Sequence, residues 1–177
     1  MFFDLIFVLV VSALIVINFK TLLLPNAVTF PGFIAAFLVR IILALCGADD
    51  AAQQVTALLF SSPVVTAILD SLLGAFTGAG ILWTVNKIWN QVRGNEIIGY
   101  GDMKMLAMIG AYLGIFNAFG VLFFGAVFAS GSLLILKAIT NSKVFVLPSG
   151  AFWGMPAIFL TLLNVNRIAA WIGERAG

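Results

Sequence analysis

Long apolar stretches separated by short polar segments run through the first half of the chain. The first stretch extends from Phe2 to about Asn18, or as far as Leu24 if Lys20 is tolerated near its end. The second runs from Val28 to about Cys46, and the third from Val64 to about Asn86. Each has the length of roughly 20 residues that an apolar helix needs to cross a bilayer core. The pattern therefore predicts three transmembrane helices in this half.

The second half of the chain continues the same pattern with one difference. The apolar stretch that starts near Ile98 and ends near Ile139 is too long for a single crossing. A break near Gly114 and Asn117 would divide it into a fourth and a fifth helix. A sixth stretch covers Leu147 to about Asn164. The sequence thus predicts an all-α membrane protein, a polytopic bundle of about six transmembrane helices.

Composition supports placement in a membrane. Of the 177 residues, 63% are hydrophobic and only 9% are charged, and the mean hydropathy is +1.17. A soluble domain carries about a quarter of its residues as charged side chains. The apolar excess must therefore face lipid. The net charge of +2 and the lack of a basic run exclude nucleic acid as an expected partner.

Two residue types narrow the chemistry. The chain has no histidine and a single cysteine, Cys46. Zinc hydrolysis by histidine ligands and catalytic triads with a histidine base are excluded, and no disulfide or cysteine metal site can form within the chain. We expect no metal and no cofactor. With no repeat and no second domain in the pattern, residues 1–177 are interpreted as one transmembrane domain.

The basic residues predict an orientation. Arginine and lysine concentrate in cytoplasmic loops of membrane proteins. Most of those in this chain fall in the first, third and fifth loops: Lys20, Lys87, Arg93, Lys104, Lys137 and Lys143. A minority, Arg40, Arg167 and Arg175, lies toward the other side. We expect these three loops to be cytoplasmic and both ends of the chain to face outward.

Pairs of glycines four residues apart predict close helix packing. They are Gly74 with Gly78, Gly110 with Gly114, and Gly150 with Gly154. Small residues at this spacing let two helix backbones approach each other in a membrane.

Two acidic residues remain at positions that need an explanation, because ionisable groups at membrane depth are costly and are often functional. Asp70 lies near the N-terminus of the third predicted helix, where the helix dipole favours an acid. Asp102 follows Gly99, Tyr100 and Gly101 and opens the fourth helix. The glycines permit close backbone approach, as an extended peptide beside the acid would require. Helix capping is an alternative explanation for both acids.

Proteolysis by aspartate requires two carboxylates that share a proton, one acting as base for water and the other as acid. A partner for Asp102 must lie at the same membrane face. The end of the first predicted helix has the right depth and side, but its polar residue is the amide Asn18, followed by Leu24, Pro25 and Asn26.

These segments resemble those of a known family. Gly99-Tyr-Gly-Asp-Met-Lys104 resembles the Gly-x-Gly-Asp-x-Lys signature of type IV prepilin peptidases, which are Gly-x-Gly-Asp intramembrane aspartyl proteases. Asn18 stands seven residues before Pro25, at the position of the first catalytic aspartate of that family. The segments Leu69–Ala75 and Leu147-Pro-Ser-Gly150 also look like family segments, in the same order.

The resemblance implies an endopeptidase that removes the leader of type IV prepilins or pseudopilins at the cytoplasmic face of the bacterial inner membrane. Asp102 would be one catalytic carboxylate and position 18 would be the other. Gly99, Gly101, Lys104, Pro25, Asn26, Pro148 and Gly150 would shape the site. An amide cannot act as a base, so Asn18 predicts an inactive or impaired active site. The Cys-x-x-Cys motifs linked to N-methylation in many members are not found in this sequence, and no methyltransferase activity is expected.

Three alternatives remain at this point. The chain could be a Gly-x-Gly-Asp protease that acts on another membrane signal peptide. It could be a scaffold that binds substrate without cutting it, which Asn18 would allow. It could also be a small transporter, in which case Asp70 and Asp102 should face one continuous polar cavity.

Overall fold

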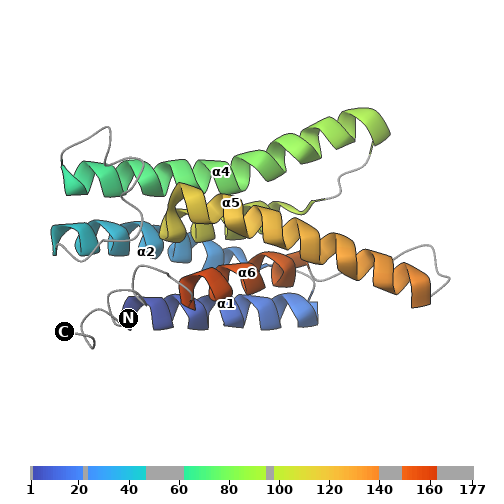
Figure 1. Ribbon diagram of the computed structural model, residues 1–177, viewed down its shortest axis with the longest axis horizontal. Coiled ribbons are helices and arrows are strands. Elements are labelled where there is room, and N and C mark those ends of the chain that lie inside the picture. Colours follow the sequence, from blue (N-terminus) through green and yellow to red (C-terminus); the bar gives the residue numbers. More distant parts are fainter. Residues whose placement is uncertain (1, 22–23, 47–61, 95–97, 140–148, 163–177) are drawn as a thin grey trace, which may run out of the picture.

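The computed structural model describes residues 2–21, 24–46, 62–94, 98–139 and 149–162. The secondary structure of these residues is entirely helical (Figure 1). The helices are α1 (Phe2–Thr21), α2 (Asn26–Leu45), α4 (Pro63–Arg93), α5 (Tyr100–Ile139) and α6 (Ser149–Leu162). By length and composition α1, α2, α4 and α5 can each cross a membrane, and α6 is a shorter apolar helix. The predicted all-α polytopic membrane fold is confirmed.

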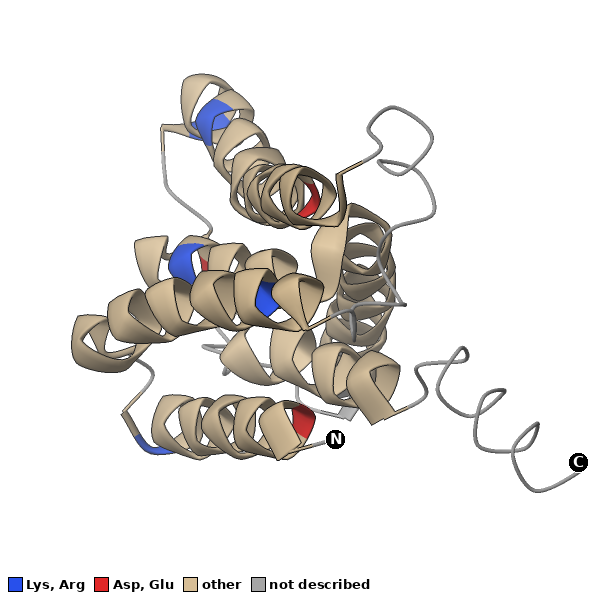
Figure 2. Ribbon diagram, turned by 90° about the vertical axis from the view of Figure 1, so that its left-hand side faces the viewer, with Lys and Arg blue, Asp and Glu red and all other residues tan. Residues whose placement is uncertain are grey.

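Apolar side chains cover the outside of the bundle, as lipid exposure demands. Large hydrophobic residues such as Phe76, Phe116 and Phe123 are mostly exposed. Figure 2 shows how few positions along the helices carry charge. The buried core is centred on the first half of α5, where Met105, Leu106, Met108 and Ile109 are almost completely buried. The other helices surround this segment.

The first half of α5, residues 100–113, runs antiparallel to α4. Gly110 meets the backbone of Gly74, and farther along the pair Leu106 meets Gly78. A Cβ atom on any of the three glycines would collide with the facing backbone. The predicted role of the glycine pairs in close packing is therefore confirmed for α4 and α5.

Helix α5 reverses its direction at Gly114. This residue has φ 80° and ψ 176°, outside the helical region, and a positive φ of this size favours glycine. The two halves of α5 meet α6 in opposite senses, so they run in opposite directions. The first half brings Asp102 to Ser149 and Met105 to Gly154, whereas the second half brings Gly125 to Trp153 and Gly120 to Leu160. Both ends of α5 accordingly lie toward one end of the bundle (Figure 1). The halves correspond in sequence to the predicted fourth and fifth helices, and the break lies at Gly114 rather than at Asn117. The first half, residues 100–113, is shorter than the full crossing that was predicted for it.

Side chains from neighbouring helices bind the backbone groups that the reversal frees. Ser71 donates a hydrogen bond to the carbonyl oxygen of Ala111 (2.6 Å), and Arg40 donates one to that of Tyr112 (3.3 Å). Past the break, the carboxylate of Asp70 accepts a hydrogen bond from the amide of Ile115 (3.2 Å). Non-helical backbone at membrane depth is tolerated only where protein or water satisfies it. Side chains of α2 and α4 therefore stabilise the backbone of α5 at the reversal.

Asp70 does not have the role that its position near the start of α4 predicted. It forms an ion pair with Arg40 of α2, with 2.8 Å between Nη2 and Oδ2, and it caps the second half of α5 rather than its own helix. The helix-dipole explanation for Asp70 is wrong. Arg40 is buried in this pair, so it is not one of the loop charges that determine orientation.

One end of the bundle gathers the segments that carry the predicted site residues. The ends of α1 and α4 and the beginnings of α2, α5 and α6 meet there. The basic residues Lys20, Lys87, Arg93 and Lys104 belong to these same helix ends. We call this the polar end of the bundle.

Candidate active site

The N-terminus of α6 connects Asn18 with Asp102. The side-chain oxygen of Asn18 accepts a hydrogen bond of 3.0 Å from the amide of Gly150. The preceding residue, Ser149, hydrogen-bonds the carboxyl group of Asp102 through its side chain. Because consecutive Cα atoms are about 3.8 Å apart, these contacts bring positions 18 and 102 to the same helix end. The two residues are separated by more than eighty positions in the sequence, and both are buried.

Gly150 allows Asn18 to sit against the backbone of α6. A Cβ atom at position 150 would lie 3.0–3.2 Å from the side chain of Asn18. One turn further, the absence of a side chain at Gly154 likewise lets Ile15 of α1 pack against the backbone of α6. The Gly150 and Gly154 pair therefore acts as predicted, and it determines how deeply α1 packs against α6.

Asp102 lies in the first turn of α5 and also caps the N-terminus of this helix. Its amide donates to the carbonyl oxygen of Gly99 (3.1 Å), and a backbone hydrogen bond from Gly99 reaches its carboxyl group. An acid that reaches back to the residue three positions earlier has the geometry of a capping box. Asp102 is thus a helix-capping residue and also the acid that faces Ser149.

Gly101 is required by the packing of the chain itself. A Cβ atom there would lie 3.0 Å from Cβ of Leu24, in the segment that connects α1 to α2. Close approach at this glycine was predicted, but for a substrate peptide. The neighbour in the structure is Leu24. A Cβ atom at Gly99 would meet only the Asp102 carboxylate, at 3.8 Å.

Lys104 joins α5 to the start of α2. Its ammonium group donates a hydrogen bond of 2.8 Å to the side-chain oxygen of Asn26. Pro25 precedes α2 as its N-cap residue, and its carbonyl oxygen accepts hydrogen bonds from the amides of Val28 and Thr29. Lys104 is exposed at the polar end.

The structure brings together most of the predicted site residues. Asp102, Asn18, Gly99 and Gly150 are linked directly around the N-terminus of α6. Gly101, Lys104, Pro25 and Asn26 form the adjoining contact between α5 and the start of α2. Pro148 lies outside the described residues.

Ser149 was missed as a site residue, although it belongs to the Leu147–Gly150 segment that carries the resemblance. Its hydroxyl group, one position before Gly150, could have indicated a hydrogen-bonding partner for a site acid.

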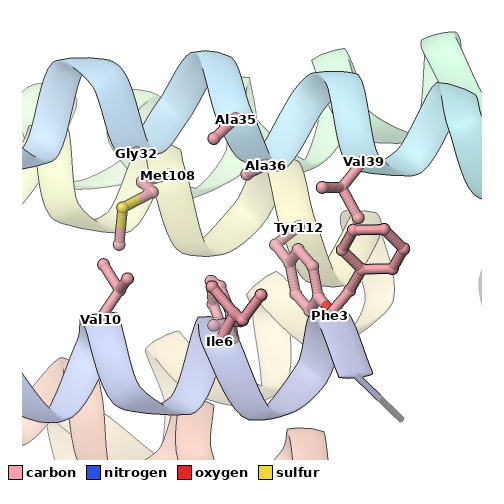
Figure 3. A pocket seen from close by; sticks show the side chains of 10 residues that line it. Phe3, Ile6, Val10, Gly32, Ala35, Ala36, Val39, Met108 and Tyr112 are labelled. Carbon is pink, nitrogen blue, oxygen red and sulfur yellow. The ribbon is translucent and has the colours of Figure 1, made fainter.

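An apolar pocket opens between α1 and α2, nearer the middle of the bundle. Figure 3 shows Ile6 and Val10 of α1 facing the small residues Gly32 and Ala36 of α2, with Met108 of α5 between the two helices. Its lining is almost entirely apolar. Asp70 and Asp102 do not line it. Asp70, on α4, contacts α5 at Ile115, whereas Asp102 lies in the first turn of α5, so the two acids are at opposite ends of the first half of α5. This pocket is therefore not the shared polar cavity that a transporter predicts.

The fold and the polar end define a polytopic helical membrane protein with a buried acid and a buried amide at one helix terminus. Residues 5–136 match the sequence profile of the type IV leader peptidase family. This match covers well over half of the chain, and the protein belongs to that family. The resemblance seen in the motifs is confirmed.

Individual relatives agree with the profile. The chain is 33% identical over 107 residues to a prepilin leader peptidase/N-methyltransferase of Aeromonas salmonicida, covering 58% of this chain and 35% of the relative. The protein of the same name from Klebsiella pneumoniae is 30% identical over 98 residues, 55% of this chain and 34% of the relative. A shorter match of 45 residues to the Stutzerimonas stutzeri protein reaches 49% identity and covers 25% of this chain and 16% of the relative. The matched part is thus about a third of the length of the first two relatives. No solved structure gives a significant match.

Proposed function

We propose that this protein is an intramembrane aspartyl endopeptidase that removes the leader of type IV prepilins or pseudopilins. Asp102 is one carboxylate of the catalytic pair, and position 18 is the place of the other. The observation that carries the proposal is the start of α6, where Ser149 and Gly150 bind these two side chains side by side. Family membership supports the reaction, and the relatives carry the name of that activity.

The amide at position 18 impairs the enzyme. In a proton-sharing pair, one member must ionise to activate water, and an amide does not titrate. Asn18 nevertheless fits the site without strain, because its oxygen accepts the Gly150 amide as a carboxylate oxygen would. An aspartate in the same place would also lie at the N-terminus of α6, where the helix dipole favours negative charge. The protein therefore keeps the shape of the site and lacks one of its two acids.

The site faces the cytoplasm in this proposal. The polar end carries Lys20, Lys87, Arg93 and Lys104, as expected for the cytoplasmic side of a bacterial inner membrane. A prepilin has a basic leader followed by a long apolar helix, so its cleavage site lies at this interface. The apolar pocket between α1 and α2 begins about two helical turns from the polar end, because Gly32 lies six residues into α2. It extends into the bundle along the direction that the apolar helix of a bound prepilin would take.

The test compares the protein with its Asn18→Asp variant, each mixed in detergent with a prepilin peptide that spans the leader junction. We expect cleavage after the leader glycine to be at least about a hundredfold faster with the aspartate, the gain typical of restoring a general acid or base. Asp102→Ala in the Asn18→Asp background should abolish it. Mass spectrometry of the products gives the position of the cut.

Equal cleavage rates with asparagine and aspartate at position 18 would contradict the assignment of the pair. If neither form cuts but both bind the peptide, the protein is a non-catalytic scaffold, which is the alternative that Asn18 keeps open. If the restored form cuts only a different membrane signal peptide, the protease assignment stands and the prepilin substrate does not.

A further inference from the structure

The C-terminal end of α4 diverges from the other helices of the bundle (Figure 1). With 31 residues, the helix is about 46 Å long at 1.5 Å per residue, against a hydrocarbon core of about 30 Å. Asn86 is the last buried residue of the helix, and its side-chain oxygen accepts a hydrogen bond of 3.2 Å from the amide of Ile98. All residues from Lys87 to Gly94 are exposed with respect to the described part of the chain.

This end of α4 is amphipathic. At 100° per residue one side carries apolar residues at spacings of four, three and four: Ile81, Val85, Ile88 and Val92. All four are exposed, and Val92 is 72% exposed. The other side carries the polar residues Thr84, Lys87, Asn90 and Gln91, together with Trp83. We call residues 81–93 the α4 extension. An apolar stripe of this kind must be covered where the helix leaves the hydrocarbon core.

Two tryptophans of the α4 extension are paired with basic side chains. The Lys87 ammonium group lies 4.7 Å from the centre of the Trp83 ring, and the Arg93 guanidinium lies 5.6 Å from that of Trp89. Both rings are partly exposed. Tryptophan concentrates at the level of the lipid headgroups, and basic side chains near it reach anionic headgroups.

We infer that the α4 extension is a binding surface for anionic phospholipid headgroups. Its apolar stripe lies at the boundary between acyl chains and headgroups, and Lys87 and Arg93 contact the phosphates. Charge complementarity selects this partner, because every ionisable side chain described in the extension is basic. A prepilin leader, itself basic, would be repelled by the same residues. Binding of this kind fixes the tilt of α4 and the height of the polar end relative to the membrane surface.

The test measures the depth of two adjacent residues in vesicles. In a Cys46→Ser background, a nitroxide is attached to Val92→Cys on the apolar stripe or to Gln91→Cys on the polar side. The full chain is reconstituted in phosphatidylcholine containing about one-third phosphatidylglycerol, an anionic surface of the kind that attracts basic segments. Collision rates with oxygen and with a water-soluble nickel chelate present on both sides report the depth. No prepilin is needed, so the result is independent of the proposed protease activity.

We expect the label at position 92 to collide with oxygen more than with nickel, and the label at 91 to do the reverse. Lys87→Gln should raise the nickel accessibility at position 92 about fivefold, the factor that corresponds to about 1 kcal/mol per basic residue. The matched variant Lys20→Gln removes a charge at the same end of the bundle and should leave it unchanged. Vesicles of phosphatidylcholine alone should behave like Lys87→Gln. Equal nickel accessibility at 91 and 92 would overturn the inference, as would protection at 92 that appears only when a prepilin peptide is added.

Discussion

Arg40 of α2 and Asp70 of α4 form a buried ion pair, 2.8 Å between Nη2 and Oδ2, that also holds the point where α5 reverses. Arg40 donates a hydrogen bond to the carbonyl oxygen of Tyr112 near the end of the first half, and Asp70 accepts one from the amide of Ile115 in the second half. The pair thus has opposite charges that match the free backbone groups at each side of Gly114. Its position deep in the bundle makes it a structural element rather than a part of the polar end.

Removing one partner of this pair should destabilise the protein strongly. Arg40→Met leaves the Asp70 carboxylate buried without its counter-ion, and breaking a buried pair in this way costs about 3–5 kcal/mol. The free energy of unfolding in mixed detergent and SDS micelles is the measurement. Asp70→Asn keeps an acceptor for the Ile115 amide and should lose less than Asp70→Ala.

The double variant Arg40→Met with Asp70→Leu provides the control. It removes both charges together, so its loss should be smaller than the sum of the two single losses. Additive losses would show that the two side chains act separately.

Alanine at Gly114 should be poorly tolerated. The residue has a positive φ, and a Cβ atom would collide with the Asp70 carboxylate. Both effects destabilise the folded state, and we expect a loss of about 2 kcal/mol or more. Gly131→Ala in the second half of α5 is the matched control, because a Cβ atom there meets nothing within 4 Å. Alanine is favoured over glycine in helices by about 1 kcal/mol, so this variant should be neutral or stabilised. Equal thermal stability of the two variants would contradict the structure at the reversal.

Ser149 should act as a positioning residue for Asp102. In the Asn18→Asp background, Ser149→Ala removes a hydrogen bond to the carboxyl group, and kcat should fall about tenfold. KM should change little, since Ser149 acts through Asp102 and not through the substrate. Ser149→Thr keeps a hydroxyl at the same place and should recover most of the rate. A rise in KM with unchanged kcat would instead place Ser149 in contact with the prepilin.

The pocket between α1 and α2 should matter for substrate binding. Ala35→Trp fills it from the α2 side. In the Asn18→Asp background we expect KM for a prepilin to rise about tenfold, equivalent to about 1.4 kcal/mol of binding, because the apolar helix loses its place. A short peptide that contains only the leader junction should be cut at an unchanged rate. Leu38→Trp, on an exposed part of α2 outside the pocket, is the control for a bulky residue in lipid.

The restored pair should titrate as one unit. With aspartate at position 18, the rate of cleavage should depend on pH as a bell with two macroscopic pKa values, because two carboxyl groups share one proton. The residual rate of the Asn18 form should lack one limb of this bell. A single-limbed profile in the restored form would show that position 18 does not take part in proton transfer.

The sequence predicts the helices of this protein well and their contacts less well. Hydropathy alone places α1, α2 and α4 to within a few residues, except that α4 runs on to Arg93 beyond its apolar part. The break in α5 follows from length, since residues 98–139 exceed one crossing. The glycine pairs also indicate where backbones touch, because small residues at that spacing let helices approach closely, although Gly114 is additionally required by the positive φ of the reversal.

Other features depend on contacts between helices distant in sequence. The ion pair brings together Arg40 and Asp70, which are thirty residues apart in the sequence. Each had a simpler local explanation: Arg40 as a loop charge, and Asp70 as an acid near the start of a helix. The contact of Asn18 with Gly150 spans 132 positions. The family resemblance identified Asn18 and Gly150 as site positions, but it did not indicate that the N-terminus of α6 packs against the end of α1. Local patterns carry no information on which helix ends meet.

The reversal at Gly114 constrains the order in which the protein is assembled during synthesis. Residues 100–113 make a helix of about 21 Å, too short to cross the bilayer by itself. In bare lipid its last carbonyls and the amide of Ile115 would lose their hydrogen bonds, a cost of several kcal/mol for each group. Arg40, Asp70 and Ser71, which bind these groups, all precede α5 in the chain. The ribosome therefore delivers α2 and α4 to the membrane first, and the helix that carries Asp102 enters a site already prepared to receive it.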